Sequence, residues 1–126
     1  MDIPIITPNT LNEISLESGP VVVEFFADWC SKCAMMSDVF LRIAMRHQHD
    51  IHFKKVNIEI SQKVVDELGI EIVPTFIVYQ KGKILGYTSG VLSENVLEQR
   101  ILALLTHNQN GASEPGIDSQ NDKTGY

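Results

Sequence analysis

The sequence predicts an α/β fold in which helices flank a mixed central sheet, in the order βαβαβαββα. Three patterns indicate this class. The apolar run 21–27 has the length and composition of a strand buried on both faces, and a helical pattern follows it. The runs 75–79 and 83–88 flank a short turn, as in a β-hairpin. Beyond the hairpin, apolar residues recur at helical spacing up to Leu105, which predicts a closing helix.

The chain before the buried strand is expected to form a short strand and a helix. Residues 3–6 suit an edge strand, and Thr10 and Glu13 have the spacing of a capping box. The box predicts a helix that runs to about Glu17 and is ended by residues 18–20.

One residue interrupts the apolar strand 21–27. Glu24 lies in its middle, and a carboxyl group buried there loses hydration, so its pKa is expected to rise. A helix follows from about Cys30 to Arg46. The stripe of that helix that faces the core is expected to consist of Met36, Phe40, Ile43 and His47.

The second half of the chain continues the alternation. Residues 52–59 fit a strand, Ser61 can cap a short helix, and Gly69 closes that helix with Ile70 in position for an apolar contact. After the hairpin, Ser93 caps the last helix. The apolar residues of the last helix are Val96, Leu97, Ile101, Leu104 and Leu105.

The two cysteines of the chain, Cys30 and Cys33, are three residues apart at the start of a predicted helix. Their Cα atoms are therefore about one turn apart, within the roughly 4.4–6.8 Å that a disulfide requires. The helix N-terminus favours the thiolate of Cys30, and Lys32 adds positive charge nearby. We expect Cys30 to be the nucleophile and the more shielded Cys33 to be the resolving thiol.

Other sites can show the same cysteine spacing. The pair could be half of a zinc site, but zinc needs two further ligands, and the first candidate histidine lies roughly 20–25 Å along the helix. A structural disulfide that closes four residues constrains the unfolded chain little. Two core cysteines that meet by chance are a third possibility. The candidate zinc ligands are His47, His49, His52 and His107.

Length, composition and charge set the class of protein. With 126 residues, of which 44% are hydrophobic, we expect one domain at 1–106, followed by a disordered polar tail at 107–126. The net charge of −6 argues against a nucleic acid partner. The sequence suggests neither a signal peptide nor a membrane span, so we expect a monomer in the cytoplasm, where a CxxC pair is more often catalytic than structural.

Several separate motifs make the chain resemble thioredoxin. The resemblance implies a thioredoxin fold and a disulfide reductase without a cofactor, in which Cys30 attacks a client's disulfide and Cys33 releases the client. It also implies that a thioredoxin reductase resupplies the electrons. The motifs are Phe26 to Cys33 (FADWCSKC), Val73-Pro74-Thr75 and the turn 81–83, within a match from about Ile3 to Leu105.

The resemblance implies a docking groove for clients beside the cysteines. Trp29 corresponds to the tryptophan that offers a flat apolar contact. Pro74 corresponds to a cis-proline packed against the cysteine pair, and the backbone of Val73 pairs with an extended client. Gly90 corresponds to a glycine that completes the groove, and Ile72 stands where a glycine lets partners approach.

The resemblance also assigns a role to the anomalous carboxylate. Glu24 stands where the family has a buried aspartate behind the resolving cysteine, and Lys55 corresponds to a lysine that partners it across the sheet. A carboxyl group with a raised pKa is a plausible proton acceptor for Cys33 through water. The pair Ser31-Lys32 replaces Gly-Pro, and Asp38 replaces a proline that kinks the helix.

A second class of function stays open. A thioredoxin-like module that docks one protein partner, with little or no redox turnover, could carry the same fold. The intact cysteine pair favours the enzyme, whereas Ile72 and the long tail suit a specialised partner.

Overall fold

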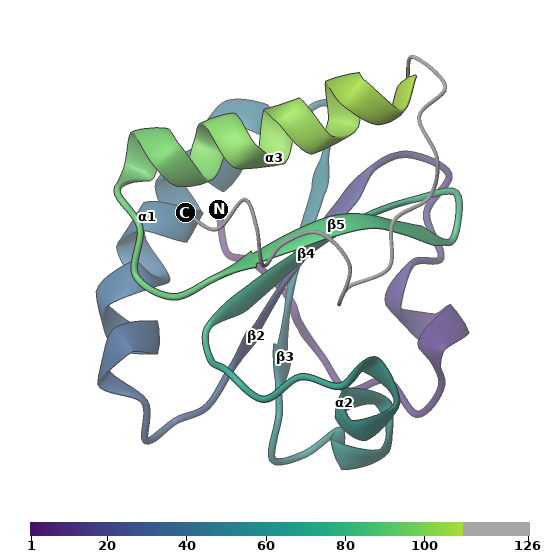
Figure 1. Ribbon diagram of the computed structural model, residues 1–126, viewed down its shortest axis with the longest axis vertical. Helices are drawn as coiled ribbons and strands as arrows, with labels where there is room; N and C mark the ends of the chain where they lie inside the picture. Colours follow the sequence, from purple (N-terminus) through teal and green to yellow (C-terminus); the bar gives the residue numbers. More distant parts are fainter. Residues whose placement is uncertain (110–126) are drawn as a thin grey trace.

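The structure is a computed structural model that describes residues 1–109, and it confirms the predicted mixed sheet flanked by helices (Figure 1). The first of the helices is a single 3-10 turn, η1. The elements are β1 (Ile5–Ile6), η1 (Leu11–Ile14), β2 (Val21–Phe26), α1 (Ser31–His47), β3 (His52–Asn57), α2 (Gln62–Leu68), β4 (Thr75–Gln80), β5 (Lys83–Ser89) and α3 (Glu94–Gln109).

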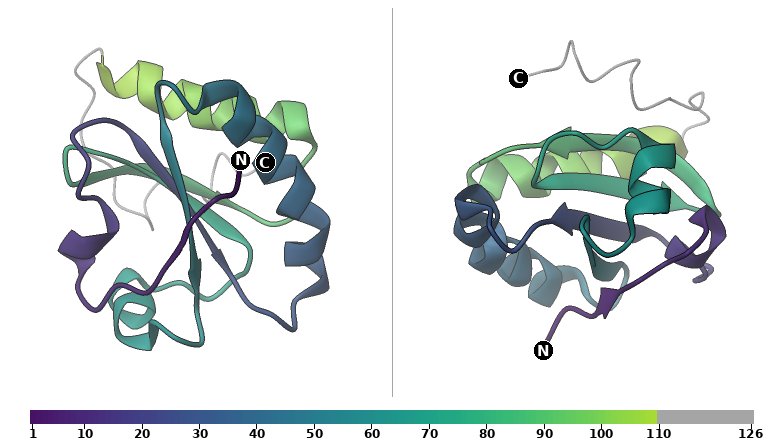
Figure 2. Two further views of the ribbon diagram at one scale, coloured as in Figure 1. Left: turned by 180° about the vertical axis from the view of Figure 1, so that it is seen from behind. Right: turned by 90° about the horizontal axis from the view of Figure 1, so that it is seen from below.

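The strand order places the cysteine pair beside the predicted proline loop. The order is β1-β3-β2-β4-β5, with β1 and β5 at opposite edges of the sheet (Figure 2, right). The central strand β2 runs parallel to β3 and antiparallel to β4, and Phe25 pairs with Thr75. The end of β2 that leads to Cys30 therefore adjoins the start of β4, which follows Pro74.

The sheet buries an apolar core on each face. Successive side chains of a strand point to opposite faces, so Val22 and Glu24 of β2 face α1 and α3, whereas Val21 and Val23 face η1 and α2. The core beneath α1 and α3 includes Val22, Met36, Phe40, Ile43, Phe53, Phe76, Leu97 and Ile101. The core on the other face includes Ile14, Val21, Val23, Phe25, Val56, Val64, Val65 and Ile77.

The predicted capping-box helix is wrong in type and length. Its single turn ends at Ile14, and Thr10 makes no side-chain cap. The backbone N–H of Asn9 instead donates to Glu13 Oε1 at 2.8 Å. Because so short a segment has few hydrogen bonds of its own, a tertiary contact determines its position. Lys54 Nζ donates to the Ile14 carbonyl oxygen at 3.1 Å and to Glu17 Oε1 at 2.7 Å.

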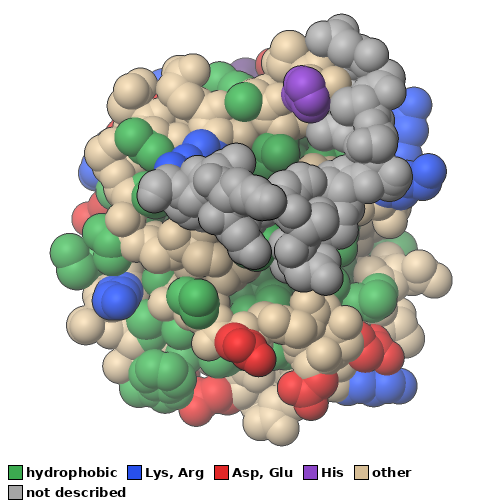
Figure 3. Space-filling model, in the orientation of Figure 1, with side chains coloured by type: hydrophobic (Ala, Val, Ile, Leu, Met, Phe, Trp, Pro, Cys, Tyr) green, Lys and Arg blue, Asp and Glu red, His purple; other side chains and the backbone are tan. Residues whose placement is uncertain are grey.

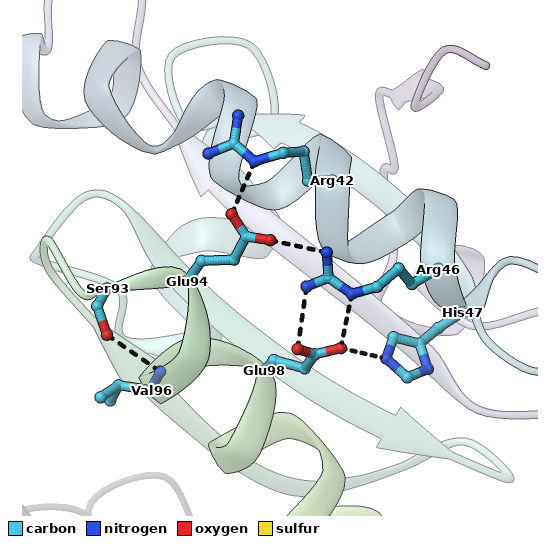
Figure 4. A network of polar contacts seen from close by, with 7 residues as sticks. All are labelled: Arg42, Arg46, His47, Ser93, Glu94, Val96 and Glu98. Atoms are coloured by element: carbon cyan, nitrogen blue, oxygen red, sulfur yellow. Dashed lines mark hydrogen bonds and ion pairs between the residues drawn. The ribbon is translucent and has the colours of Figure 1, made fainter.

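An ionic network joins α1 to α3, and it corrects the prediction that His47 faces the core (Figure 4). His47 Nε2 lies 2.6 Å from Glu98 Oε2, at the same carboxylate that Arg46 binds through two nitrogens. Glu94 bridges Arg46 and Arg42, at 2.7 Å from each. The polar rim of α1 therefore binds α3 while Phe40 and its neighbours fill the space beneath.

The helix termini differ in how they are capped. Ser93 Oγ accepts from the N–H of Val96 at 3.2 Å, as predicted, although Val96 itself is 37% exposed rather than in the core. Ser61 makes no side-chain cap. Gly69 ends α2 with a φ of 72°, a left-handed conformation that glycine adopts without strain.

The last helix, α3, continues to Gln109, three residues into the predicted tail. The rest of that prediction, 110–126, lies outside the described residues. Among the helices that the structure describes, none has the length and apolar composition needed to cross a membrane.

Candidate active site

The two cysteines meet at the N-terminus of α1. Cys30 is the N-cap residue, and its Sγ accepts a hydrogen bond from the backbone N–H of Cys33 at 3.1 Å. Both are free thiols, 8% and 6% exposed. Because the first N–H groups of a helix have no partner within it, this position stabilises negative charge on the sulfur of Cys30.

The loop before β4 contacts the nucleophile Cys30. The Cys30 thiol donates to the Val73 carbonyl oxygen at 3.7 Å, and the peptide bond between Val73 and Pro74 is cis, as the resemblance implies. The N–H of Gly90 donates to the Pro74 carbonyl oxygen at 2.9 Å. Gly90 has a φ of 92°, a conformation in which a side chain would be strained, and this explains the glycine here. Its hydrogen bond continues the pairing of β4 with β5 as far as Pro74.

Exposed apolar side chains surround the buried thiols. Trp29 is 67% exposed and Ile72 is 60% exposed, both where the resemblance places client contacts. Two further residues extend this surface: Ile60 is 64% exposed and Val91, which follows Gly90, is 44% exposed. The sequence analysis missed both, although an isoleucine between a strand and a helix cap was a signal that could have identified Ile60.

Trp29 is held by a contact that the sequence analysis also missed. Its indole Nε1 donates to Glu59 Oε2 at 2.9 Å. The backbone N–H of Glu59 in turn donates to the side-chain oxygen of Asn57 at 2.9 Å, and the Asn57 amide nitrogen lies 3.3 Å from Asp28 Oδ2. The loop after β3 therefore fixes the orientation of the indole.

Glu24 and Lys55 are paired across the sheet, as predicted. They are register partners in β2 and β3, with Lys55 Nζ 3.8 Å from Glu24 Oε1, and Glu24 is 1% exposed. This distance exceeds that of a hydrogen bond, and Oε1 has no hydrogen-bond partner among the described residues. Burial raises the pKa of Glu24 from 4.5 to about 7, against the opposing effect of the Lys55 charge.

A pocket of about 190 Å³ connects this carboxyl group to the cysteines. Burial, the hydrogen bond with Cys30, and the charges at Cys30 and Glu24 raise the pKa of the Cys33 thiol to about 12. Glu24, whose pKa is raised to about 7, lines the same pocket as Cys33. The lining residues include Glu24, Cys30, Cys33, Ser37 and Lys55.

Within residues 1–109, no group of three or more His, Cys, Asp or Glu side chains is arranged to hold a metal ion. The candidate zinc ligand nearest in sequence, His47, instead pairs with Glu98 at the far end of α1.

Comparison with known proteins agrees with this geometry. The thioredoxin family model matches residues 3–103. Thioredoxin 1 of Nostoc is 30% identical over 97 residues, which are 76% of this chain and 91% of that protein. Thioredoxin 1 of Synechococcus elongatus is 30% identical over 73% of this chain and 87% of its own length. The oxidized mitochondrial thioredoxin 3 of Saccharomyces cerevisiae superposes with a TM-score of 0.71 at 25% identity, over 79% of this chain and 93% of that one. The chain therefore belongs to the thioredoxin family of thiol–disulfide oxidoreductases, with Cys30 and Cys33 as its CxxC pair.

Proposed function

We propose that this oxidoreductase works as a protein-disulfide reductase. The observation that carries the proposal is the position of Cys30, which is at a helix N-terminus and against the Val73 carbonyl, and is surrounded by exposed apolar side chains. A protein client can cover such a surface, and a buried nucleophile at its centre reacts only with a disulfide that has docked.

The reaction begins with attack of the Cys30 thiolate on one sulfur of the client disulfide. The client S–S bond breaks, its second sulfur leaves as a thiolate, and a mixed disulfide joins Cys30 to the client. Cys33 then loses its proton to Glu24 through water and attacks Cys30 Sγ. The client leaves with two thiols, reduced by two electrons, and the Cys30–Cys33 pair becomes a disulfide.

The residues around the pair bind the client. The exposed ring of Trp29 and the side chain of Ile72 cover apolar client surface. The backbone of Val73, beside the cis peptide bond to Pro74, pairs with an extended client segment, and Gly90 leaves room at the end of the ladder. Lys55 tunes the charge on Glu24, which acts as the base.

Turnover needs a source of electrons, for which we propose a thioredoxin reductase. We also propose that the protein is a monomer in the cytoplasm, since a reducing compartment keeps such a pair in its dithiol form. A kinetic assay of whether a thioredoxin reductase reduces the oxidised Cys30–Cys33 pair tests the electron donor. Cell fractionation tests the compartment, and sedimentation tests the oligomeric state.

The test of the function is insulin reduction, followed as turbidity with dithiothreitol as electron source. We predict that the natural protein accelerates precipitation and that Cys30→Ser abolishes the acceleration. Cys33→Ser retains the attacking thiol and should accumulate a mixed disulfide with the client, visible by mass spectrometry and removed by reductant.

The exposed side chains of Ile60 and Ile72 favour one alternative, a module that binds a protein partner with little redox turnover. The insulin assay separates the two functions. A natural protein that fails to accelerate precipitation, although its two thiols titrate and its circular dichroism is that of a folded domain, would support the binding module.

A further inference from the structure

A second pocket lies beside the loop that contains Val73 and Pro74. Its volume is about 150 Å³, and it is formed by residues that precede and follow these two in the sequence. Ile70, Glu71 and Ile72 come from the segment between α2 and Pro74, Thr75 begins β4, and Tyr87 and Ser89 come from β5.

Apart from Glu71, the side chains that line this pocket are apolar or already hydrogen-bonded. Ile70 and Tyr87 pack against the core beneath α2. The Thr75 hydroxyl donates to the Ile72 carbonyl oxygen and lies 2.8 Å from Ser89 Oγ, so the two hydroxyls bond each other. Among its side chains, the pocket offers an incoming group the apolar surfaces of Ile70, Ile72 and Tyr87 and one charge, the Glu71 carboxylate.

Glu71 is exposed and, within residues 1–109, has no ion-pair partner. Several other glutamates of the domain are paired with basic side chains: Glu17, Glu24, Glu94 and Glu98. In Figure 3 acidic side chains lie over the lower part of the view, around the position of α2 in Figure 1, with a basic side chain beside them. The charge at this pocket is thus available to a cation from outside.

The position of the pocket relates it to the client. Under the proposed function, a client segment pairs with Val73 while its disulfide reaches Cys30 Sγ, which is 3.7 Å from the Val73 carbonyl oxygen. The pocket is formed by Ile72 and Thr75, the residues on either side of the Val73–Pro74 pair. Residues of an extended client segment are about 3.3 Å apart. Client side chains one to three positions from the reacting cysteine can therefore reach this pocket.

We propose that this pocket is a specificity subsite that takes a lysine or arginine side chain of the client, near the reacting cysteine. The aliphatic stem lies on Ile70, Ile72 and Tyr87, and the cationic head pairs with Glu71, as long basic side chains do when an apolar surface leads to water. The subsite rests on the proposed function and names the class of client that the enzyme reduces fastest.

The test uses pairs of short peptides joined by one disulfide. In one set, lysine, glutamine or glutamate occupies each position from three residues before to three residues after the cysteine, one position at a time. The second-order rate constant for reduction by the dithiol protein is measured by chromatography of the released thiol. Peptides of the same composition, with lysine far from the cysteine, control for net charge.

We expect lysine to increase the rate constant by up to about fivefold over glutamine at one or two positions on the same side of the cysteine, the upper end of the range for an exposed ion pair. The ratio should fall to about one in Glu71→Gln and should reverse in Glu71→Lys. Glu67→Gln, the same change at an exposed residue of α2 outside the pocket, should keep the ratio of the natural protein. Salt should weaken the preference.

A preference that is equal at every position, or that persists in Glu71→Gln, overturns the subsite and leaves the reductase intact. A natural protein that reduces none of the peptides refutes the proposed function itself. The two failures are therefore distinguishable within one experiment.

Discussion

Glu24 is a carboxyl group in the apolar face of β2, and its protonation links catalysis to stability. Burial raises its pKa from 4.5 to about 7, so between these values the folded protein holds a proton that the unfolded chain has released. The stability from this proton is fully present below the ordinary pKa and is lost as the pH rises through the folded pKa. The domain should therefore be less stable at pH 8 than at pH 5 through this group.

We predict that Glu24→Gln removes this pH dependence. At pH 8 the variant should be more stable than the natural protein by about 3 kcal/mol, because the amide needs no charge to be buried, whereas at pH 5 the difference should be small. Urea denaturation at both pH values measures it. Glu67→Gln, at an exposed position, should show no such difference, and an equal effect of Glu24→Gln at both pH values would contradict the assignment.

The same variant should slow release of the client. We predict that the resolving step of the natural protein accelerates as the pH rises through about 7, where Glu24 becomes able to accept the Cys33 proton. In Glu24→Gln the step should be slower by about a hundredfold, at the low end for general-base catalysis, and its rise near neutrality should disappear. Decay of a preformed mixed disulfide on Cys30, followed by rapid quenching, gives this rate. An unchanged rate would remove Glu24 from the mechanism.

The two thiols should differ in reactivity. The pKa of Cys33 is raised to about 12, whereas Cys30 is at the helix N-terminus. We predict that iodoacetamide alkylates Cys30 first in the reduced protein at about pH 7.5. This pH is well below the pKa of Cys33, so Cys33 is almost entirely in its unreactive thiol form. Peptide mapping identifies the labelled residue. Faster labelling of Cys33 would reverse the two roles.

At the residue level, the sequence predicted groups whose chemistry is unusual for their place and missed contacts between distant segments. Glu24 could be identified because a carboxyl group interrupts an apolar strand, and Cys30 and Cys33 because of their spacing. The bond between Trp29 and Glu59 spans 30 positions and has no local pattern. Nothing near Glu59 in the sequence distinguishes it from an ordinary surface glutamate.

Among the elements, η1 depends most on one tertiary contact. Lys54 is 8% exposed, and its Nζ binds both Glu17 and the carbonyl oxygen of Ile14. The ion pair also holds the pKa of Glu17 below its ordinary value, although burial opposes this. The stability from this pair is present above the ordinary pKa of Glu17 and is lost as the pH falls through the lowered value.

We predict that Lys54→Met lowers the free energy of unfolding by about 1–3 kcal/mol, because it leaves the Ile14 carbonyl oxygen without its donor and Glu17 without its cation. Lys63→Met, at an exposed position of α2, is the matched control and should change stability little. Urea denaturation near pH 7 compares the two. Equal effects of both substitutions would mean that the contact does not anchor η1.

These contacts also explain which elements could be predicted. The sequence predicts β2 from an apolar run that is buried on both faces, the β4–β5 hairpin from its short turn, and α3 from apolar residues at helical spacing. Each of these signals lies within the element itself. The capping box at Thr10 predicted a longer helix than η1, since a one-turn segment is positioned by Lys54 rather than by its own hydrogen bonds. The spacing of His47 along α1 predicts that it faces the core, but its ring instead pairs with the carboxylate of Glu98 on α3, at the edge of the core.

At the scale of the whole molecule, burial along α3 marks the C-terminal boundary of the domain. The predicted boundary was residue 106, whereas α3 continues to Gln109. Burial gives a physical criterion for the boundary: Leu105, at 7% exposure, packs in the core, while Thr106 and His107 are exposed. The core therefore makes its last contact with α3 before the polar sequence begins.

We predict that a chain ending at Gln109 keeps both the stability and the activity of the full chain. Residues 110–126 contain few large apolar side chains, so we expect little stabilisation from burial of apolar area there, and every residue proposed for the site precedes them. The melting temperature should change by less than about 2 °C, because a shift of several degrees requires about 1 kcal/mol in a domain of this size. Differential scanning calorimetry and the insulin assay compare the two chains.

A chain ending at Leu104, which lacks the buried Leu105, is the positive control and should melt several degrees lower. A loss of stability or activity on removing 110–126 alone would show that this segment contributes to the domain, and the boundary would then lie beyond Gln109.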